Sequence, residues 1–297
     1  MNFRTDLALE LRENFRGKEI AGIRCETIEK DNAKVTRIDV LDEEGAKALG
    51  KPLGKYITVE VPPFTKSAQL LDGRLEAVAQ ELAGLLPKEG TVLVAGLGNE
   101  SITPDALGPK CSELTLATRH ISGEIAKSMG LGDLRAVSAI VPGVLGRTGI
   151  ETGEIIAGVV KTVQPSVVIT VDALAARRLS RLGCTVQMAT SGITPGSGVG
   201  NARTEINEST LGVPVVSVGV PTVVDAATLA YDLVSQSHSE INEEELRNNL
   251  EPDGSQMMIT PREIDLVIER ASRLVALAIN RALQPHIDAE DLLSLVS

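Results

Sequence analysis

The sequence predicts an α/β fold, a three-layer αβα architecture with a mostly parallel central sheet and a small N-terminal β-containing subdomain. Short apolar segments rich in valine alternate with segments of helical spacing, which is typical of a parallel sheet buried on both faces. The 297 residues are 43% hydrophobic, so the chain is long enough to bury a core without disulfides or metals. Aromatic residues make up 2% of the chain, so valine, isoleucine, leucine and alanine must form that core.

The N-terminal region is polar and charged, and its pattern predicts a small β subdomain over residues 34–61. Strands are predicted at Lys34–Leu41 and Tyr56–Val61, with a helix between them at Glu43–Leu49. After a Pro-Pro pair, apolar residues at helical spacing predict a further helix over Lys66–Leu86.

Five short apolar segments then predict the strands of the central sheet. They are Thr91–Gly96, Arg135–Val141, Val167–Val171, Thr185–Ala189 and Val213–Val218. Between them, Glu151 and Glu154 fit the first turn of a helix, where acidic residues are favourable.

The last part of the chain departs from this alternation. Ser235–Ser255 is polar and acidic, and we expect a mobile surface insertion over residues 235–255. Thr260–Glu263 then fits a capping box with proline at the first helical position, followed by an apolar stripe to about Leu283. We therefore predict one α/β domain over residues 7–297.

Composition excludes several classes of function. The formal net charge is −11, and nucleic-acid binding needs an excess of lysine and arginine, so no direct nucleic-acid partner is expected. The three cysteines include no CxxC pair, which argues against a disulfide framework or a cysteine zinc site. No apolar stretch resembles a signal peptide or a membrane span. We expect a cytoplasmic protein with no membrane partner.

Aspartates follow three of the predicted strands. In open parallel sheets, sites form beyond the carboxyl ends of the strands, where Asp105, Asp172 and Asp225 stand. If the strands before Asp105 and Asp172 are neighbours, the two carboxylates converge. Two close carboxylates share a proton, so one can activate water while the other protonates a leaving group.

Each aspartate also has a structural alternative. Asp105 fits the first turn of a helix opened by Thr103, and Asp172 fits the N-cap of a helix running through Arg178. Asp225 fits a capping box opened by Thr222. Spacing alone leaves both possibilities open.

A glycine-rich loop offers a second type of site. Gly196, Ser197, Gly198 and Gly200 lie in the segment Pro195–Asn201, and the backbone N–H groups there could hold a substrate carbonyl or an oxyanion. A flexible turn is the alternative. The loop lacks the lysine of a phosphate-binding loop, and Gly96-Leu97-Gly98 lacks the third glycine of a dinucleotide site.

Nucleophile and metal sites find less support. Cys111 and His120 stand nine positions apart, which places them on opposite faces of one continuous helix. The three histidines are scattered along the chain. We expect no cofactor and no resident metal.

Several long motifs resemble the germination protease family of endospore-forming bacteria. They are FRTDLALE (3–10), ESITPDALGPK (100–110), ATRH (117–120), VPGVLGRTGIETGEII (141–156), VDALAARRLSRL (171–182), SGITPGSGVGNARTEI (191–206) and TLGVPVVSVGVPTVVDA (210–226). The resemblance implies an atypical aspartic-type endopeptidase with an αβα fold, assembled as a homotetramer in the spore core. Its substrates would be the small acid-soluble spore proteins. The family's two proposed catalytic aspartates match Asp105 and Asp172 here.

The resemblance also implies a self-processing zymogen. The family's processing site resembles the segment Arg4–Glu10, with the cut between Asp6 and Leu7. Residues 1–6 would then form a short pro-segment.

Two other functions remain open at this point. One is a metal-assisted peptidase related to the hydrogenase-maturation proteases, which loss of activity in EDTA would support. The other is a non-catalytic acidic binding protein, which would leave a small acid-soluble spore protein intact. Such a binding protein has no need of the RTDLALE segment.

Overall fold

The computed structural model describes residues 5–15, 17–30, 33–66, 69–128, 130–200, 203–236 and 257–296. Of the predicted pro-segment, residues 1–4 lie outside this range. Most of the predicted insertion, residues 237–255, also lies outside it.

One mixed sheet of nine strands forms the centre of the described structure. The strands are β1 (Ile23–Lys30), β2 (Ala33–Val40), β3 (Gly54–Glu60), β4 (Val92–Gly96), β5 (Val137–Ile140), β6 (Val167–Ala176), β7 (Thr185–Ala189), β8 (Val215–Asp225) and β9 (Met258–Ile259). Their order is β1-β2-β3-β7-β8-β6-β4-β5, with β9 paired to β8.

The sheet has two halves of different type. The pairings β8·β6, β6·β4 and β4·β5 are parallel, and β4, β6 and β8 are buried over almost their whole length. The pairings from β1 through β2, β3 and β7 to β8 are antiparallel. The N-terminal strands therefore extend the central sheet through the contact of β3 with β7.

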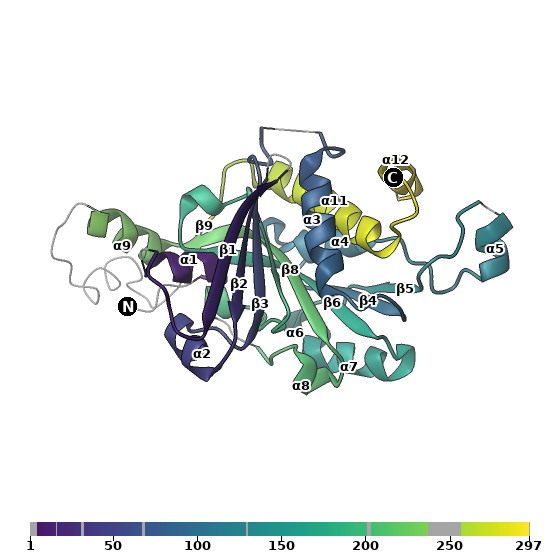
Figure 1. Ribbon diagram of the computed structural model, residues 1–297, viewed down its shortest axis with the longest axis horizontal. Coiled ribbons are helices and arrows are strands. Elements are labelled where there is room, and N and C mark those ends of the chain that lie inside the picture. Colours follow the sequence, from purple (N-terminus) through teal and green to yellow (C-terminus); the bar gives the residue numbers. More distant parts are fainter. Residues whose placement is uncertain are drawn as a thin grey trace.

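Helices cover both faces of the sheet. The α-helices are α1 (Ala8–Glu13), α2 (Glu43–Leu49), α3 (Gly73–Leu85), α4 (Leu107–Glu113), α5 (Gly123–Ser128), α6 (Leu145–Thr148), α7 (Thr152–Val163), α8 (Glu208–Leu211), α9 (Ala226–Gln236), α11 (Ile264–Leu283) and α12 (Ala289–Leu295). Short 3₁₀ helices lie at η1 (Thr103–Asp105), η2 (Leu179–Arg181) and η3 (Ser197–Val199). In Figure 1, α3, α4 and α11 lie above the sheet, and α7 and α8 lie below it.

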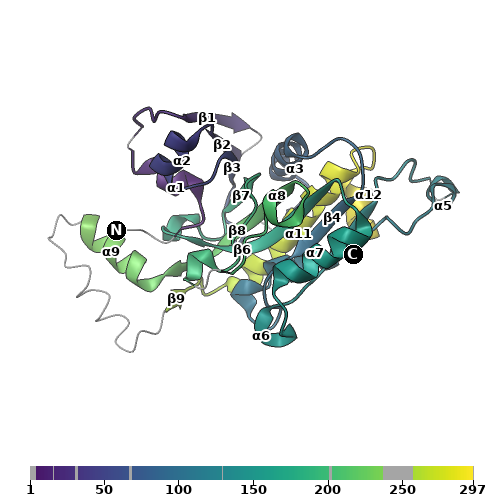
Figure 2. The same ribbon diagram turned by 90° about the horizontal axis from the view of Figure 1, so that it is seen from below.

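Side chains alternate between the two faces of each strand, so a hydrophobic core forms on each face of the sheet. On β4, Val92 and Val94 pack toward α3, α4 and α11, whereas Leu93 and Ala95 pack toward α7. Helices α1 and α2 cover the N-terminal strands through a third cluster that includes Ala8, and Figure 2 shows them beside β1–β3.

The predicted α/β class with helices on both faces is confirmed. Helix α2 begins after Asp42, whose side chain accepts a hydrogen bond from Gly45 N–H, and ends at Gly50 in the left-handed region. Helix α7 begins with the expected acidic pair, because Glu151 and Glu154 form a capping box. The division into a pro-segment, a β subdomain and one peptidase domain stays a prediction.

Several local predictions are wrong. Helix α3 begins at Gly73 and not at Lys66, because the Asp72 side chain caps it by accepting a hydrogen bond from Arg74 N–H. The chain after Asp172 continues as strand β6 to Ala176 and does not form a helix through Arg178, because pairing with β8 continues along this segment. Thr222 lies inside strand β8, so it does not open a capping box for Asp225. The last long helix begins at Ile264, since the Thr260 hydroxyl donates to the Thr222 carbonyl.

Candidate active site

Asp172 lies inside strand β6, close to the carboxyl end of the parallel half of the sheet. Its neighbour across the pairing with β8 is Gly219, where an added Cβ would lie 2.6 Å from Leu174 Cγ and 2.7 Å from the Asp172 carbonyl oxygen. Asp172 is 6% exposed. Among the described residues, the N–H of Ala173 is the one hydrogen-bond donor to its carboxylate, at 2.9 Å from Oδ1.

Asp105 ends η1, in the loop that follows β4. The loop folds back on itself at Gly98, where φ is +114° and an added Cβ would lie 2.1 Å from the Asp105 carbonyl oxygen. The N–H of Asn99 donates to Asp105 Oδ2 at 2.7 Å. The Thr222 hydroxyl donates to the Pro104 carbonyl oxygen at 2.8 Å, which ties this loop to strand β8.

The two carboxylates affect each other electrostatically. Burial raises the pKa of Asp172 well above its ordinary value, and the charges of Asp105 and then Asp6 raise it further. Burial also raises the pKa of Asp105, and the hydrogen bond from Asn99 partly offsets this. A buried carboxyl group beside another carboxylate retains its proton to higher pH. Of the two groups, Asp172 is therefore the one that keeps its proton to higher pH.

A cavity of about 530 Å³ joins these residues. Asp105, Asp172 and Asp6 all line it, together with Gly196 and Gly198 of the glycine-rich loop. The expected convergence follows from sheet order, because β4 and β6 are hydrogen-bonded neighbours. The structure thus brings the two predicted aspartates and part of the predicted loop to one cavity.

The glycine-rich loop holds the side chain of Asp6. The Ser197 hydroxyl donates to Asp6 Oδ1 at 3.0 Å, and the N–H of Ala175 donates to Asp6 Oδ2 at 2.8 Å. A Cβ on Gly198 would lie 2.2 Å from Asp6 Oδ2, so only glycine leaves room for this carboxylate. Gly200 does not line the cavity, and its N–H donates to the Ser197 carbonyl oxygen.

Hydrogen bonds hold the backbone of Asp6 at both its N–H and its carbonyl group. The N–H of Asp6 donates to the Ala175 carbonyl oxygen at 2.9 Å, and the Lys51 ammonium donates to the Asp6 carbonyl oxygen at 3.0 Å. Burial lowers the pKa of Lys51, which the charge of Asp6 partly offsets. Leu7 is fully buried, in a cluster that includes Leu174.

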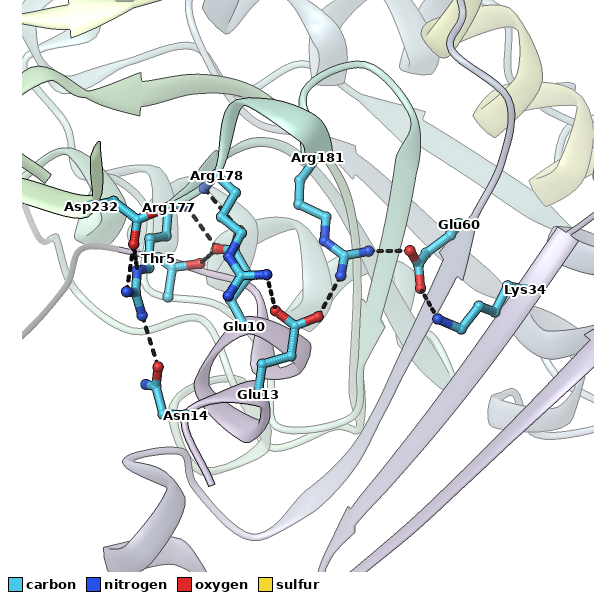
Figure 3. A network of polar contacts seen from close by, with 10 residues as sticks. All are labelled: Thr5, Glu10, Glu13, Asn14, Lys34, Glu60, Arg177, Arg178, Arg181 and Asp232. Carbon is cyan, nitrogen blue, oxygen red and sulfur yellow. Dashed lines mark hydrogen bonds and ion pairs between the residues drawn. The ribbon is translucent and has the colours of Figure 1, made fainter. Parts of the chain in front are cut away.

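A network of ion pairs fixes α1 to the segment after β6 (Figure 3). Glu10 is 1% exposed, and its carboxylate accepts hydrogen bonds from the N–H groups of Arg177 and Arg178. Glu13 pairs with Arg178 at 3.0 Å and with Arg181 at 2.6 Å. Sequence reasoning missed this network and Lys51. The sequence does hold a signal for this network, because two acidic residues near the N-terminus, Glu10 and Glu13, match three arginines that follow Asp172.

The remaining candidates have structural roles or none. Asp225 is fully buried, and its Oδ1 accepts a hydrogen bond from Thr228 N–H at 2.8 Å, so it caps α9. Cys111 is buried in α4, and burial raises the pKa of its thiol. Within the described residues, no three His, Cys, Asp or Glu side chains are grouped as a metal site.

The comparisons with known proteins give the family. A model described as germination protease matches residues 5–244. The chain belongs to the germination protease family. It is 44% identical to the germination protease of Clostridium perfringens and 43% identical to that of Caldanaerobacter subterraneus subsp. tengcongensis, in each case over 98% of this chain. The alignments cover 98% and 97% of those relatives.

The match to the family extends to more distant members. The germination protease of Priestia megaterium is 37% identical over 97% of this chain and 95% of its own length. A solved hydrogenase maturation protease, HycI from Thermococcus kodakarensis, superposes with a TM-score of 0.36 at 18% identity. That superposition covers 67% of this chain and 98% of HycI.

Membership of the germination protease family makes the chain a peptidase. The matched region includes Asp6, Asp105 and Asp172, the three carboxylates that line the cavity. No helix in the described ranges is both long and apolar enough to cross a membrane.

Proposed function

We propose that this germination protease is an endopeptidase that degrades small acid-soluble spore proteins, with Asp105 and Asp172 as its acid–base pair. The observation that carries the proposal is the shared cavity, in which the charge of Asp105 raises the pKa of Asp172. The family resemblance supports a homotetramer that acts in the spore core. Neither nucleic acid nor a membrane has a part in the proposal.

Each carboxyl group has one role in the proposed hydrolysis. Ionised Asp105 accepts a proton from a water molecule as the water oxygen bonds to the carbonyl carbon of the substrate. Protonated Asp172 gives its proton to the amide nitrogen as the C–N bond breaks. The pair therefore titrates as a unit, with apparent pKa values that belong to both residues.

The glycine-rich loop supplies the proposed substrate-binding site. Asp6 provides an example of a bound acidic residue, since Ser197 and Ala175 donate to its carboxylate and Gly198 leaves room for it. An acidic side chain on the residue before the substrate bond to be cut would take the same position. We therefore propose that the chain cuts itself between Asp6 and Leu7, as a zymogen.

Substitution of each aspartate tests the pair. We expect Asp105→Asn and Asp172→Asn each to lower the rate of cleavage of a purified small acid-soluble spore protein at least about a hundredfold. Both variants should also leave the Asp6–Leu7 bond intact. Asp225→Asn is the matched control, because asparagine also caps helices and this residue does not line the cavity. Full activity in either cavity variant would exclude the proposed pair.

Chelation tests the metal-assisted alternative. We expect the rate of substrate cleavage to be the same in the presence and absence of EDTA. A loss that one added divalent metal restores would instead favour a metal-assisted peptidase.

A further inference from the structure

Side chains contact both ends of the Asp6–Leu7 peptide bond. On the carbonyl side, the Lys51 ammonium donates to the Asp6 oxygen at 3.0 Å. On the nitrogen side, the Leu7 N–H donates to the Thr5 hydroxyl oxygen at 3.1 Å. That hydroxyl in turn donates to Oε2 of Glu10, as Figure 3 shows for Thr5 and Glu10. The Leu7 nitrogen is thus linked to the Glu10 carboxylate through a single hydroxyl group.

Glu10 is buried and is held by three donors among the described residues. Besides Thr5, they are the N–H groups of Arg177, at 2.7 Å, and Arg178, at 2.9 Å. Thr5 is the one donor of the three that precedes the Asp6–Leu7 bond. Burial raises the pKa of Glu10, while the hydrogen bonds and the charge of Arg181 lower it.

Hydrolysis of this bond changes the charges beside Glu10. The water oxygen bonds to the Asp6 carbonyl carbon, the C–N bond breaks, and the Leu7 nitrogen takes a proton to become an amine. An α-amine has an ordinary pKa of about 7.7–8.0, so it binds a further proton near neutral pH. Thr5 belongs to the released segment, so its departure leaves Oε2 of Glu10 without one donor beside a new ammonium group.

We propose that Glu10 is the binding site for the α-ammonium group of Leu7, which takes the place of Thr5 after the cut. The proposal rests on the proposed self-cleavage. Glu10 stands three residues after Leu7, a spacing at which a side chain can reach back to the nitrogen of the earlier residue. The same carboxylate binds the backbone directly after β6, the strand that carries Asp172. The new ion pair therefore fixes the new N-terminus to the strand of the active site.

The titration of the Leu7 amine tests the proposal. The full chain is allowed to cut itself, and modification of the Leu7 amine by acetic anhydride is followed by mass spectrometry between about pH 6 and pH 10. We expect the midpoint of the pH dependence of modification to lie at least about one pH unit higher in the wild type than in Glu10→Gln. Near neutral pH, this corresponds to modification that is about tenfold slower in the wild type. Glu13→Gln is the matched control on the same helix, and its midpoint should equal that of the wild type.

Two failures are distinguishable. If mass spectrometry finds no cut between Asp6 and Leu7, the proposed self-cleavage is wrong. The binding site is then tested in a full chain whose segment before Leu7 ends in the recognition sequence of an unrelated protease. If the Leu7 amine freed by that protease, or by the chain itself, titrates identically in the wild type and in Glu10→Gln, the binding site is overturned.

Discussion

Asp172 and Glu10 are both buried carboxylates connected to strand β6, yet their surroundings differ in kind. Asp172 accepts one hydrogen bond among the described residues and has Asp105 and Asp6 as charged neighbours. Glu10 accepts three hydrogen bonds and is stabilised by the charge of Arg181. Burial raises the pKa of both groups, but the hydrogen bonds and Arg181 partly offset this for Glu10, whereas the charges of Asp105 and Asp6 add to it for Asp172. Burial alone therefore does not identify an active-site acid.

The sharpest test of this comparison removes the well-bonded carboxylate. We expect Glu10→Ala to lower the free energy of unfolding by about 3 kcal/mol, because it leaves the N–H groups of Arg177 and Arg178 without the buried carboxylate that accepts from them. Urea unfolding followed by circular dichroism measures the loss. Glu13→Ala, at the more exposed end of the network, should cost about 1 kcal/mol or less. A smaller loss for Glu10→Ala than for Glu13→Ala would contradict the structural role assigned to Glu10.

The sequence predicted the parallel half of the sheet and its aspartates better than the rest. Buried strands such as Val167–Val171 are marked by local runs of apolar residues, and sheet order then brings Asp105 toward Asp172. Strand β1 was missed because it is an edge strand with mostly exposed side chains. Its sequence therefore lacks the alternation on which strand prediction depends.

The N-terminal contacts could not be predicted from local pattern. Glu10 binds the N–H groups of residues 167 and 168 positions later in the chain, and no periodicity records such a pairing. The strand through Asp172 was also predicted too short, because its last residues are kept extended by pairing with β8 past an irregularity at Leu174. In both cases a tertiary contact decided the outcome.

A third carboxylate, Asp6, connects the two regions, and Gly198→Ala tests its position. The added Cβ would lie 2.2 Å from Asp6 Oδ2 and 2.6 Å from Ala175 Cβ, so Asp6 or the loop must move. We expect self-cleavage between Asp6 and Leu7 to slow about tenfold or more, since catalysis is sensitive to small displacements of the bond. The rate is measured by mass spectrometry of the full chain.

Gly84→Ala is the matched glycine control. An added Cβ at this position in helix α3 meets nothing within 4 Å, and alanine favours helix over glycine. Self-cleavage should proceed at the wild-type rate, with a free energy of unfolding higher by about 0.5–1 kcal/mol. Equal rates in Gly198→Ala and Gly84→Ala would show that the fit around Asp6 does not control the cut.

The smallest expected effect is a difference in how stability depends on pH. The pKa of Asp172 in the folded chain lies well above its ordinary value of 3.8, so between these two values the folded chain binds more protons than the unfolded chain. The unfolding free energy that Asp172 contributes is therefore fully present below the ordinary value and is lost as pH rises through the raised pKa.

Asp172→Asn removes this loss. The difference in unfolding free energy between this variant and the wild type, measured by urea unfolding, should therefore grow in favour of the variant from about pH 4 upward. Asp105→Asn removes one acidic neighbour of Asp172 and should weaken the dependence without abolishing it, because burial is the larger cause of the shift. Parallel curves for the wild type and Asp172→Asn would mean that the pKa of Asp172 is not raised in the folded chain, and the contrast between the surroundings of the two carboxylates would fail.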